Sequence, residues 1–265
     1  MSVPVVATVG TTHPLAFAGL VFSALALADD GARPVCVVAG ISAQRADRVL
    51  LRIGTESAAI GAQFAALDDA GIGAVHVGAL VSVEAVLAVA AGLAGLPGVP
   101  LVIDPVLASS SGERLGEIGV ADALRDVLFP LATLVTPNLD EAAAFAGRPI
   151  PDVAAMEHAS ASFVGWGARA VLVKGGHLAG EAAVDVLVDA SGVRRFTSPR
   201  VAGSLRGTGD LLAVTIAADL ARRIPLDDAV KRARARVAHA IETGVPFART
   251  RVAPVRGDVP SGDEA

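Results

Sequence analysis

The sequence has few aromatic residues, a single cysteine and fewer basic than acidic residues. Among 265 residues there is no tyrosine, and aromatic residues make up 3%, so a platform on which nucleic-acid bases stack is not expected. The single cysteine, Cys36, excludes a disulfide framework and a metal site built from several cysteines. Acidic residues outnumber basic ones by 27 to 22, and no run of three or more consecutive basic residues occurs. Nucleic acid is therefore not expected as a partner.

Long uninterrupted hydrophobic runs are also absent. The longest, residues 15–28, is too short for a bilayer, which needs about 20 residues. Residues 25–28 resemble a signal-peptide cleavage site, but no Lys or Arg precedes Arg33, so the positive region of such a signal is missing. We expect no membrane association and a cytoplasmic location. Hydrophobic residues still make up 53%, which excludes a disordered chain and is typical of a buried parallel sheet covered by helices.

Short β-branched segments alternate with helical patterns along the chain. The pattern predicts strands at 3–9, 34–39, 74–77, 100–103, 133–135 and 170–173, a hairpin at 183–188 and 194–196, and helices at 16–29, 56–70, 83–96, 120–128, 139–146, 153–165, 209–222 and 226–243. This alternation predicts an α/β fold with a doubly wound, mostly parallel sheet. We expect one domain over residues 1–244 and a loose C-terminal extension over 245–265, where no periodicity is visible.

Polar residues follow several predicted strands directly. They include His13, Gln44, Asp104, Asn138 and Lys174. Ligands of open α/β sheets bind beyond the carboxyl ends of the strands, so this clustering indicates a binding site there. The alternative is that every strand simply ends in turn residues.

The segment Arg206–Asp210 precedes a predicted helix and combines glycines with a carboxylate. Glycine lets the backbone approach a ligand, and a helix start offers unpaired N–H groups that hold phosphate oxygens. Asp210 would then be a base for a substrate hydroxyl. The alternative is an aspartate that only complements the helix dipole.

Two further segments have residues typical of phosphate-binding and metal-binding sites. In Lys174–His177 the two glycines can form an anion nest, and Lys174 is one of two lysines in the chain. Asn138 and Glu141 have the spacing of a helix capping box; alternatively, Asn138 faces a nucleotide phosphate and Glu141 orients water on Mg²⁺. Asp104 adds a carboxylate, and Mg²⁺ typically takes one or two. Together these features match phosphoryl transfer, although neither a P-loop nor a Rossmann glycine motif occurs.

The segments at 103–115, 134–147, 171–189 and 207–221 resemble the ribokinase-like superfamily. Within it, the sequence is most similar to the hydroxymethylpyrimidine and phosphomethylpyrimidine kinases of thiamine biosynthesis, over residues 3–243. The resemblance implies a three-layer α/β sandwich, ATP with Mg²⁺, phosphorylation of the hydroxymethyl group of a small heterocyclic alcohol, and a homodimer. The apolar helix at 16–28 offers a packing face for such a dimer.

The resemblance also implies a role for individual positions. Asp210 would be the catalytic base, with Gly207, Thr208 and Gly209 as the anion hole. The nucleotide would contact Lys174, Gly176, Asn138 and Thr136, and Mg²⁺ would lie near Asp104 and Glu141. The acceptor would contact Gln44, His13, Gly10, Ala18 and Phe17.

The acceptor loop at 10–19 departs from the family pattern. The family's acid is replaced by His13, and two of its glycines by Ala16 and Phe17; Ser110 stands where the family has lysine. Asp210 replaces the cysteine usual in the pyrimidine kinases, as in sugar and pyridoxal kinases. A pyridoxal-type or other small-molecule kinase, or a non-catalytic ligand-binding protein, is therefore kept as an alternative. His13 either binds the acceptor or is a surface residue.

Overall fold

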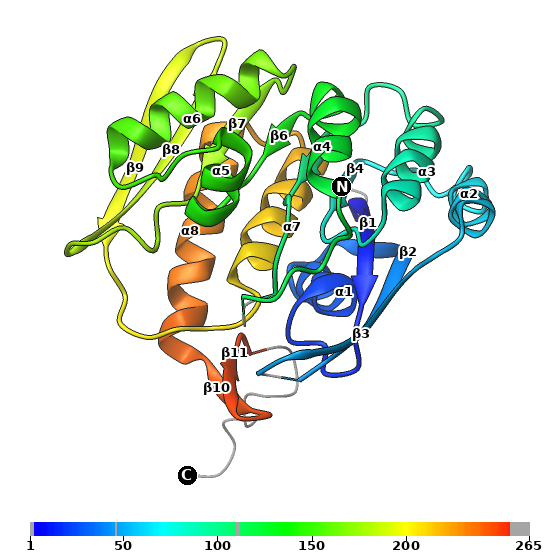
Figure 1. Ribbon diagram of the computed structural model, residues 1–265, viewed down its shortest axis with the longest axis horizontal. Helices are drawn as coiled ribbons and strands as arrows, with labels where there is room; N and C mark the ends of the chain where they lie inside the picture. Colours follow the sequence, from blue (N-terminus) through cyan, green and yellow to red (C-terminus); the bar gives the residue numbers. More distant parts are fainter. Residues whose placement is uncertain (1–2, 46, 110–111, 255–265) are drawn as a thin grey trace.

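A central mixed sheet with helices on both faces organises the molecule (Figure 1). The computed structural model describes residues 3–45, 47–109 and 112–254; Ser110 and the segment 255–265 lie outside them. The strands are β1 (Val5–Thr12), β2 (Arg33–Gln44), β3 (Val49–Gly54), β4 (Ala74–Val77), β5 (Leu101–Ile103), β6 (Leu134–Val135), β7 (Ala170–Val173), β8 (Ala182–Asp189) and β9 (Gly192–Pro199). Their order in the sheet is β3-β2-β1-β4-β5-β6-β7-β8-β9. The strands from β2 to β7 in this order are parallel, and β3, β8 and β9 are antiparallel to their neighbours.

Alternate residues of the strands build two cores, one on each face of the sheet. Val6 and Ala74 face the core made with α1 (Gly19–Asp29), α7 (Thr208–Ala221) and α8 (Leu226–Thr243). Ala7 and Val75 face the opposite core. That core includes α2 (Ser57–Ala65), α3 (Val83–Leu93), α5 (Leu139–Ala146) and α6 (Val153–Gly165), together with α4 (Val120–Ala123) and the π-helical turn Leu124–Leu128 that continues it. The predicted doubly wound α/β architecture is confirmed.

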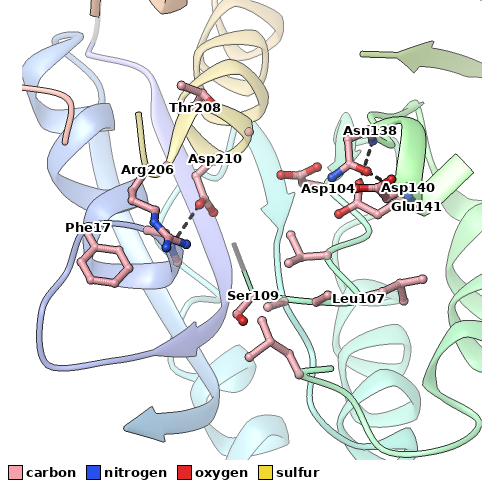
Figure 2. Close-up of a pocket in the computed structure, with 18 of the residues that line it drawn as sticks. Phe17, Asp104, Leu107, Ser109, Asn138, Asp140, Glu141, Arg206, Thr208 and Asp210 are labelled. Atoms are coloured by element: carbon pink, nitrogen blue, oxygen red, sulfur yellow. Dashed lines mark hydrogen bonds between the residues drawn. The ribbon is translucent and has the colours of Figure 1, made fainter. Parts of the chain in front are cut away.

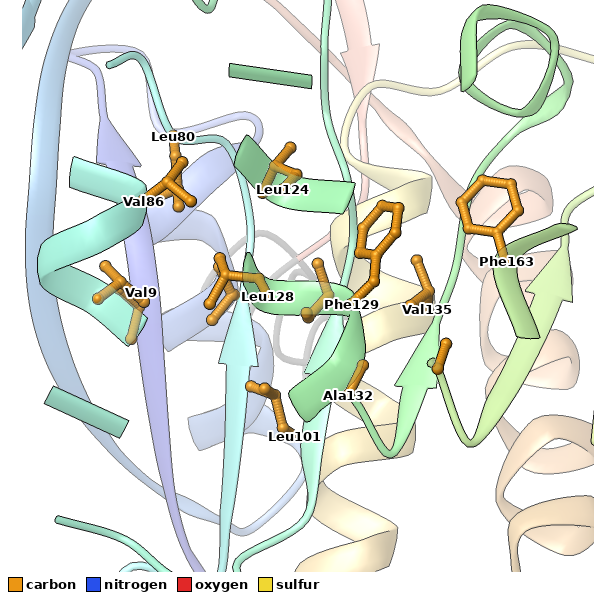
Figure 3. Close-up of a cluster of buried hydrophobic side chains, with 14 of the residues drawn as sticks. Val9, Leu80, Val86, Leu101, Leu124, Leu128, Phe129, Ala132, Val135 and Phe163 are labelled. Carbon is orange, nitrogen blue, oxygen red and sulfur yellow. The ribbon is translucent and has the colours of Figure 1, made fainter. Parts of the chain in front are cut away.

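The second core is filled by large side chains from the segment that follows α4. Leu128 and Phe129 are fully buried, and Figure 3 shows them beside Leu101 and Val135 of the sheet. Burying such a side chain contributes about 1.5–3 kcal/mol. This packing fixes the segment between β5 and β6, both of which end at the candidate site.

Two features differ from the expectations. Strand β3 was not predicted. Residues 245–254, expected to be loose, include the hairpin β10 (Val245–Phe247) and β11 (Thr250–Val252), and the amide of Arg206 donates to the carbonyl of Arg251 over 3.0 Å. One apolar face of α1 packs inside the molecule against α7 and the sheet, while Val21 and Leu25 of the same helix are 39% and 43% exposed, so the packing face predicted for a dimer stays a prediction. Among the described residues, no helix has the length and apolar character needed to cross a membrane.

Candidate active site

The carboxyl ends of the parallel strands meet at one edge of the sheet and border a cavity of about 650 Å³. Most of the predicted site residues line it: His13, Phe17, Ala18, Gln44, Asp104, Asn138, Glu141, Lys174, Gly207, Thr208, Gly209 and Asp210. Figure 2 shows Asp210 and Phe17 on one side of this cavity, with Asp104 and Glu141 across from them. Residues far apart in the sequence therefore share one space.

A second cavity of about 510 Å³ adjoins the first. Asn138, Lys174, Thr208 and Gly209 line both cavities, and Gly176 lines the second. The glycine-rich start of α7 and the end of β7 thus lie at the junction of the two. We name the first the acceptor cavity and the second the nucleotide cavity, after the ligands that the sequence resemblance implies for residues lining each of them.

Two predicted contact residues lie behind the cavity walls. Thr136 is fully buried, and its hydroxyl donates to Asp104 Oδ1 over 3.2 Å. It therefore orients a wall residue. Gly10 lies within β1, where a Cβ would come 3.6 Å from the carbonyl oxygen of Ala79, and it is not among the described residues that line either cavity.

A buried ion pair joins the ends of β5 and β7. Lys174 Nζ lies 2.6 Å from Asp104 Oδ1, and the two side chains are 15% and 2% exposed. Burial alone would lower the pKa of Lys174, but the carboxylates of Asp104 and Glu141 outweigh it and raise that pKa above its ordinary value. A Cβ at position 209 would lie 3.0 Å from Asp104 Oδ2 and 3.2 Å from Lys174 Nζ. Glycine lets the helix start approach the pair this closely.

Asp210 stands in the first turn of α7, after Gly207 in the left-handed conformation (φ 80°). Its Oδ2 accepts the backbone N–H of Gly19 over 3.1 Å. Burial, together with the charge of Asp104, raises the pKa of Asp210 to about 6. A carboxylate with this pKa is ionised at neutral pH and can still accept a proton, which suits a general base.

The capping box predicted at the start of α5 is present. Asn138 Oδ1 accepts the amide of Glu141 over 2.9 Å, and Glu141 Oε2 accepts the amide of Asn138 over 2.7 Å. Burial, with a contribution from the charge of Asp104, raises the pKa of Glu141 to about 8. A bound cation would favour the ionised form of this carboxyl group.

Carboxylate oxygens of Asp104, Asp140 and Glu141 face the acceptor cavity. No group of three or more His, Cys, Asp or Glu side chains placed to hold a metal occurs among the residues that the structure describes. The carboxylates of Asp104 and Glu141 are enough for Mg²⁺, which binds through one or two carboxylates and completes its shell with water and phosphate oxygens.

The far end of the acceptor cavity is aromatic and cationic. The rings of His13 and Phe17 lie 4.7 Å apart, and the guanidinium carbon of Arg206 lies 5.9 Å from the centre of the Phe17 ring. His13 is 6% exposed, so it is a wall residue rather than a surface residue. Burial lowers the pKa of His13, with the backbone of Ala18 opposing the shift, and this shift favours the neutral imidazole.

Some residues of the site were not assigned from the sequence. The amide of Gly19 contacts Asp210 through the fold of the 13–18 loop, which no local pattern encodes. Thr250 reaches the cavity through the hairpin at 245–254, and His177 lines both cavities. For the first of these, the one sequence signal was a glycine close to the predicted helix start; Gly19 is the first residue of α1 and has a positive φ of 70°.

Comparisons with known proteins agree with this geometry. A family model described as phosphomethylpyrimidine kinase matches residues 18–256. A hydroxymethylpyrimidine/phosphomethylpyrimidine kinase from Streptomyces coelicolor is 36% identical, over 92% of this chain and 91% of the relative. The thiamine biosynthesis bifunctional protein ThiED from Geobacter sulfurreducens is 37% identical over 70% of this chain, and the match spans 38% of that longer protein.

Two solved structures are similar over nearly the whole fold. A phosphomethylpyrimidine kinase from Clostridium difficile 630 has a TM-score of 0.79 and 28% identity, covering 91% of this chain and all of that chain. A pyridoxal kinase from Bacillus subtilis, solved as an ADP complex, has a TM-score of 0.87 and 25% identity, covering 96% of this chain and 98% of that chain.

Proposed function

Because the chain belongs to the phosphomethylpyrimidine kinase family, we propose that it transfers the γ-phosphoryl group of ATP to the hydroxymethyl group of 4-amino-5-hydroxymethyl-2-methylpyrimidine, or of its phosphate. The observation that carries the proposal is the shared cavity, in which Asp210 faces the Lys174–Asp104 pair beside the glycine-rich start of α7.

Asp210 acts as the general base. Its carboxylate takes the hydroxyl proton of the acceptor while the hydroxyl oxygen bonds to the γ-phosphorus and the bond from that phosphorus to the β-phosphate oxygen breaks, releasing ADP. The backbone N–H groups at the start of α7, over Gly207–Gly209, stabilise the negative charge of the transferred group. The ammonium of Lys174, at the junction of the two cavities, supplies positive charge beside the phosphates.

The two cavities divide the substrates between them. The nucleotide occupies the nucleotide cavity and contacts Asn138 and Gly176. The heterocycle occupies the acceptor cavity beside Phe17, His13 and Gln44. Asp104 and Glu141 would hold Mg²⁺, which neutralises charge on the phosphate oxygens.

A pyridoxal-type kinase is the second candidate. It is favoured by the presence of Asp210 where the pyrimidine kinases usually have cysteine, and by the similarity to the pyridoxal kinase of Bacillus subtilis. A non-catalytic ligand-binding protein is less well supported, because Asp210 has a position and a pKa suited to proton transfer.

We further propose that two copies of the chain associate through the ribbon formed by β2 and β3. Ile41 pairs with Ile53, and Leu51 lies on the same face of the ribbon; the three are 53%, 54% and 52% exposed. A contiguous exposed apolar face on an edge strand is a site of association, and a two-fold axis would bury the same face of both copies. A cytoplasmic location and the absence of a nucleic-acid partner stay predictions from the sequence.

ADP release measured with a panel of alcohols tests the proposal. The panel contains the hydroxymethylpyrimidine, its phosphate and pyridoxal, and each is offered with MgATP. We expect the highest kcat/KM with the pyrimidine or its phosphate. The highest value with pyridoxal would replace the substrate assignment. Thermal stabilisation by an acceptor with no ADP formation would show a binding protein instead.

A further inference from the structure

Several backbone carbonyl groups of the loop between β7 and β8 are hydrogen-bonded to one side chain. Arg200, directly after β9, donates hydrogen bonds to the carbonyl oxygens of Gly176, Leu178, Gly180 and Ala182. The distance is 2.8 Å from Nε to Gly180 and 3.0 Å from Nη2 to Ala182. A planar guanidinium with five N–H groups can make such a set of bonds, whereas a lysine ammonium has three.

This loop forms part of the wall of the nucleotide cavity. Gly176 and His177 line that cavity, and so does Arg200 itself. Gly180, with φ 114°, turns the chain so that several carbonyl groups converge on one side. Without the guanidinium these carbonyl groups would turn toward water, and the loop would sample many shapes.

The root of the same loop is held independently. The amide of Gly175 donates to Asp185 Oδ1 over 2.8 Å, and Arg234 donates to Asp185 Oδ2 over 2.8 Å. Lys174 is fixed by its ion pair with Asp104 and by the bond from its amide to the carbonyl of Pro137. Loss of Arg200 therefore leaves Lys174 in place while it releases the outer part of the loop.

We propose that Arg200 is a positioning residue for the nucleotide, holding the 176–182 loop in the shape that receives a nucleoside triphosphate. The proposal rests on the proposed function, because it takes the nucleotide to be the occupant of this cavity. The proposal predicts that Arg200 affects the affinity for nucleotide and not kcat, because the acceptor and the base Asp210 lie in the other cavity.

The test compares Arg200→Lys and Arg200→Met with a matched control, Arg195→Lys. Arg195 lies on β9, the strand that Arg200 follows, and pairs with Glu157 at the surface. Binding of the non-hydrolysable ATP analogue AMP-PCP is measured by calorimetry, and KM and kcat by ADP release. For both Arg200 variants we expect the Kd for AMP-PCP and the KM for ATP to rise about tenfold, the effect of losing one or two net hydrogen bonds. The KM for the acceptor and kcat stay close to wild type, and the control is unchanged in all four quantities.

Amide hydrogen exchange separates positioning from general stability. In the folded Arg200 variants, residues 176–182 should exchange faster than in the wild type, and AMP-PCP should slow that exchange. Variants with wild-type affinity for AMP-PCP, or with a lower melting temperature and no change in Kd, would overturn the role of Arg200. A wild-type protein that does not bind AMP-PCP would overturn the proposed function itself.

Discussion

At the scale of single residues, opposing forces set the chemistry of Asp210. A carboxylate at a helix N-terminus is favoured in its ionised form by the helix dipole and by N–H donors such as that of Gly19. Burial and the negative charge of Asp104 act against this and raise the pKa of Asp210 to about 6. The result is a base that is ionised at neutral pH and more basic than an ordinary aspartate.

Replacing this base tests its role directly. Asp210→Asn keeps the shape of the side chain and removes its ability to accept a proton, so kcat should fall by about 10²–10⁴-fold. The Kd for AMP-PCP should stay within a factor of two or so, because Asp210 does not line the cavity that we propose for the nucleotide. Turnover of the variant at the wild-type rate would remove Asp210 from the mechanism.

The pH dependence of kcat/KM is the second test at this scale. The pKa of Asp210 is raised from 3.8 to about 6, so the inactive protonated form predominates below that pH. At saturating Mg²⁺, which favours the ionised form of Glu141, we expect activity to increase as pH rises through about 6 and to level off above it. Burial lowers the pKa of His76 to about 4, so this group does not produce the rise. A flat profile between pH 5 and 7 would contradict the assignment.

The sequence could predict the charged residues of the site but not all of their partners. Asp210 and Lys174 follow glycine-rich or strand-end patterns that the fold rule places at one edge of the sheet. The contact from Gly19 depends on a loop in which Ala16 adopts a positive φ of 48°, a conformation that is rare for alanine. Tertiary packing, not local propensity, determines it.

At the scale of elements, the proposed role of the start of α7 in binding the phosphoryl group depends on its close approach to the Lys174–Asp104 ion pair. In Gly209→Ala the new methyl group would sit 3.0 Å from Asp104 Oδ2 and 3.2 Å from Lys174 Nζ, so the helix or the pair must move. We expect kcat/KM to fall about a hundredfold, because small displacements of positioned groups cost this much. The control is Gly61→Ala in α2, where a Cβ meets no atom within 4 Å and activity should be unchanged. Equal activity in both variants would contradict the close-approach argument.

The helices on the α1 side of the sheet are joined by an ionic network. Asp219 of α7 is 1% exposed and accepts from Arg232 of α8 over 2.5 Å, and Arg232 also pairs with Asp30 at the end of α1. Asp219→Ala leaves arginine charge without its buried partner. Breaking a buried pair costs up to about 3–5 kcal/mol, but Arg232 is 40% exposed to water, so we expect a loss near 2 kcal/mol.

Urea unfolding measures this loss as a lower midpoint at unchanged slope. The control is Asp126→Asn, which removes a surface pair with Arg125 and should leave the midpoint nearly unchanged. A midpoint for Asp219→Ala equal to that of the control would mean that water or Asp30 fully replaces the lost carboxylate.

Most elements were predictable because burial leaves a pattern in their sequence. Helices such as α6 and α8 carry apolar residues at the helical period, and strands such as β4 and β7 are short, mostly apolar runs buried on both faces. Strand β3 has no buried face: Leu50, Leu51 and Ile53 are all exposed, so no alternation marks it. The hairpin at 245–254 was missed for a related reason, since it forms by contact with Arg206.

At the scale of the whole molecule, the two edges of the sheet differ in kind. The β9 edge carries Arg194 and Arg195, which form ion pairs at the surface. Charge of this type discourages strand association. The β3 edge instead exposes apolar side chains on a ribbon whose other strand ends at Gln44, a wall residue of the acceptor cavity. Association at this edge would therefore also restrict the motion of one wall of the acceptor cavity.

From this difference between the edges we predict that the protein is a dimer and that the dimer contact supports acceptor binding. Sedimentation should give the wild type twice the chain mass of 26.5 kDa, and the double variant Leu51→Lys with Ile53→Lys should sediment as a monomer, because two buried charges per subunit oppose the contact. Val193→Lys, at a site 52% exposed on the β9 edge, should stay dimeric. Since Gln44 belongs to the ribbon, the monomeric variant should have a higher KM for the acceptor and an unchanged KM for ATP. A monomeric wild type would contradict the predicted dimer, and a double variant that still dimerises would mean that the interface is not the β2–β3 ribbon. An unchanged KM for the acceptor in a monomeric double variant would show that the ribbon contact does not affect the acceptor cavity.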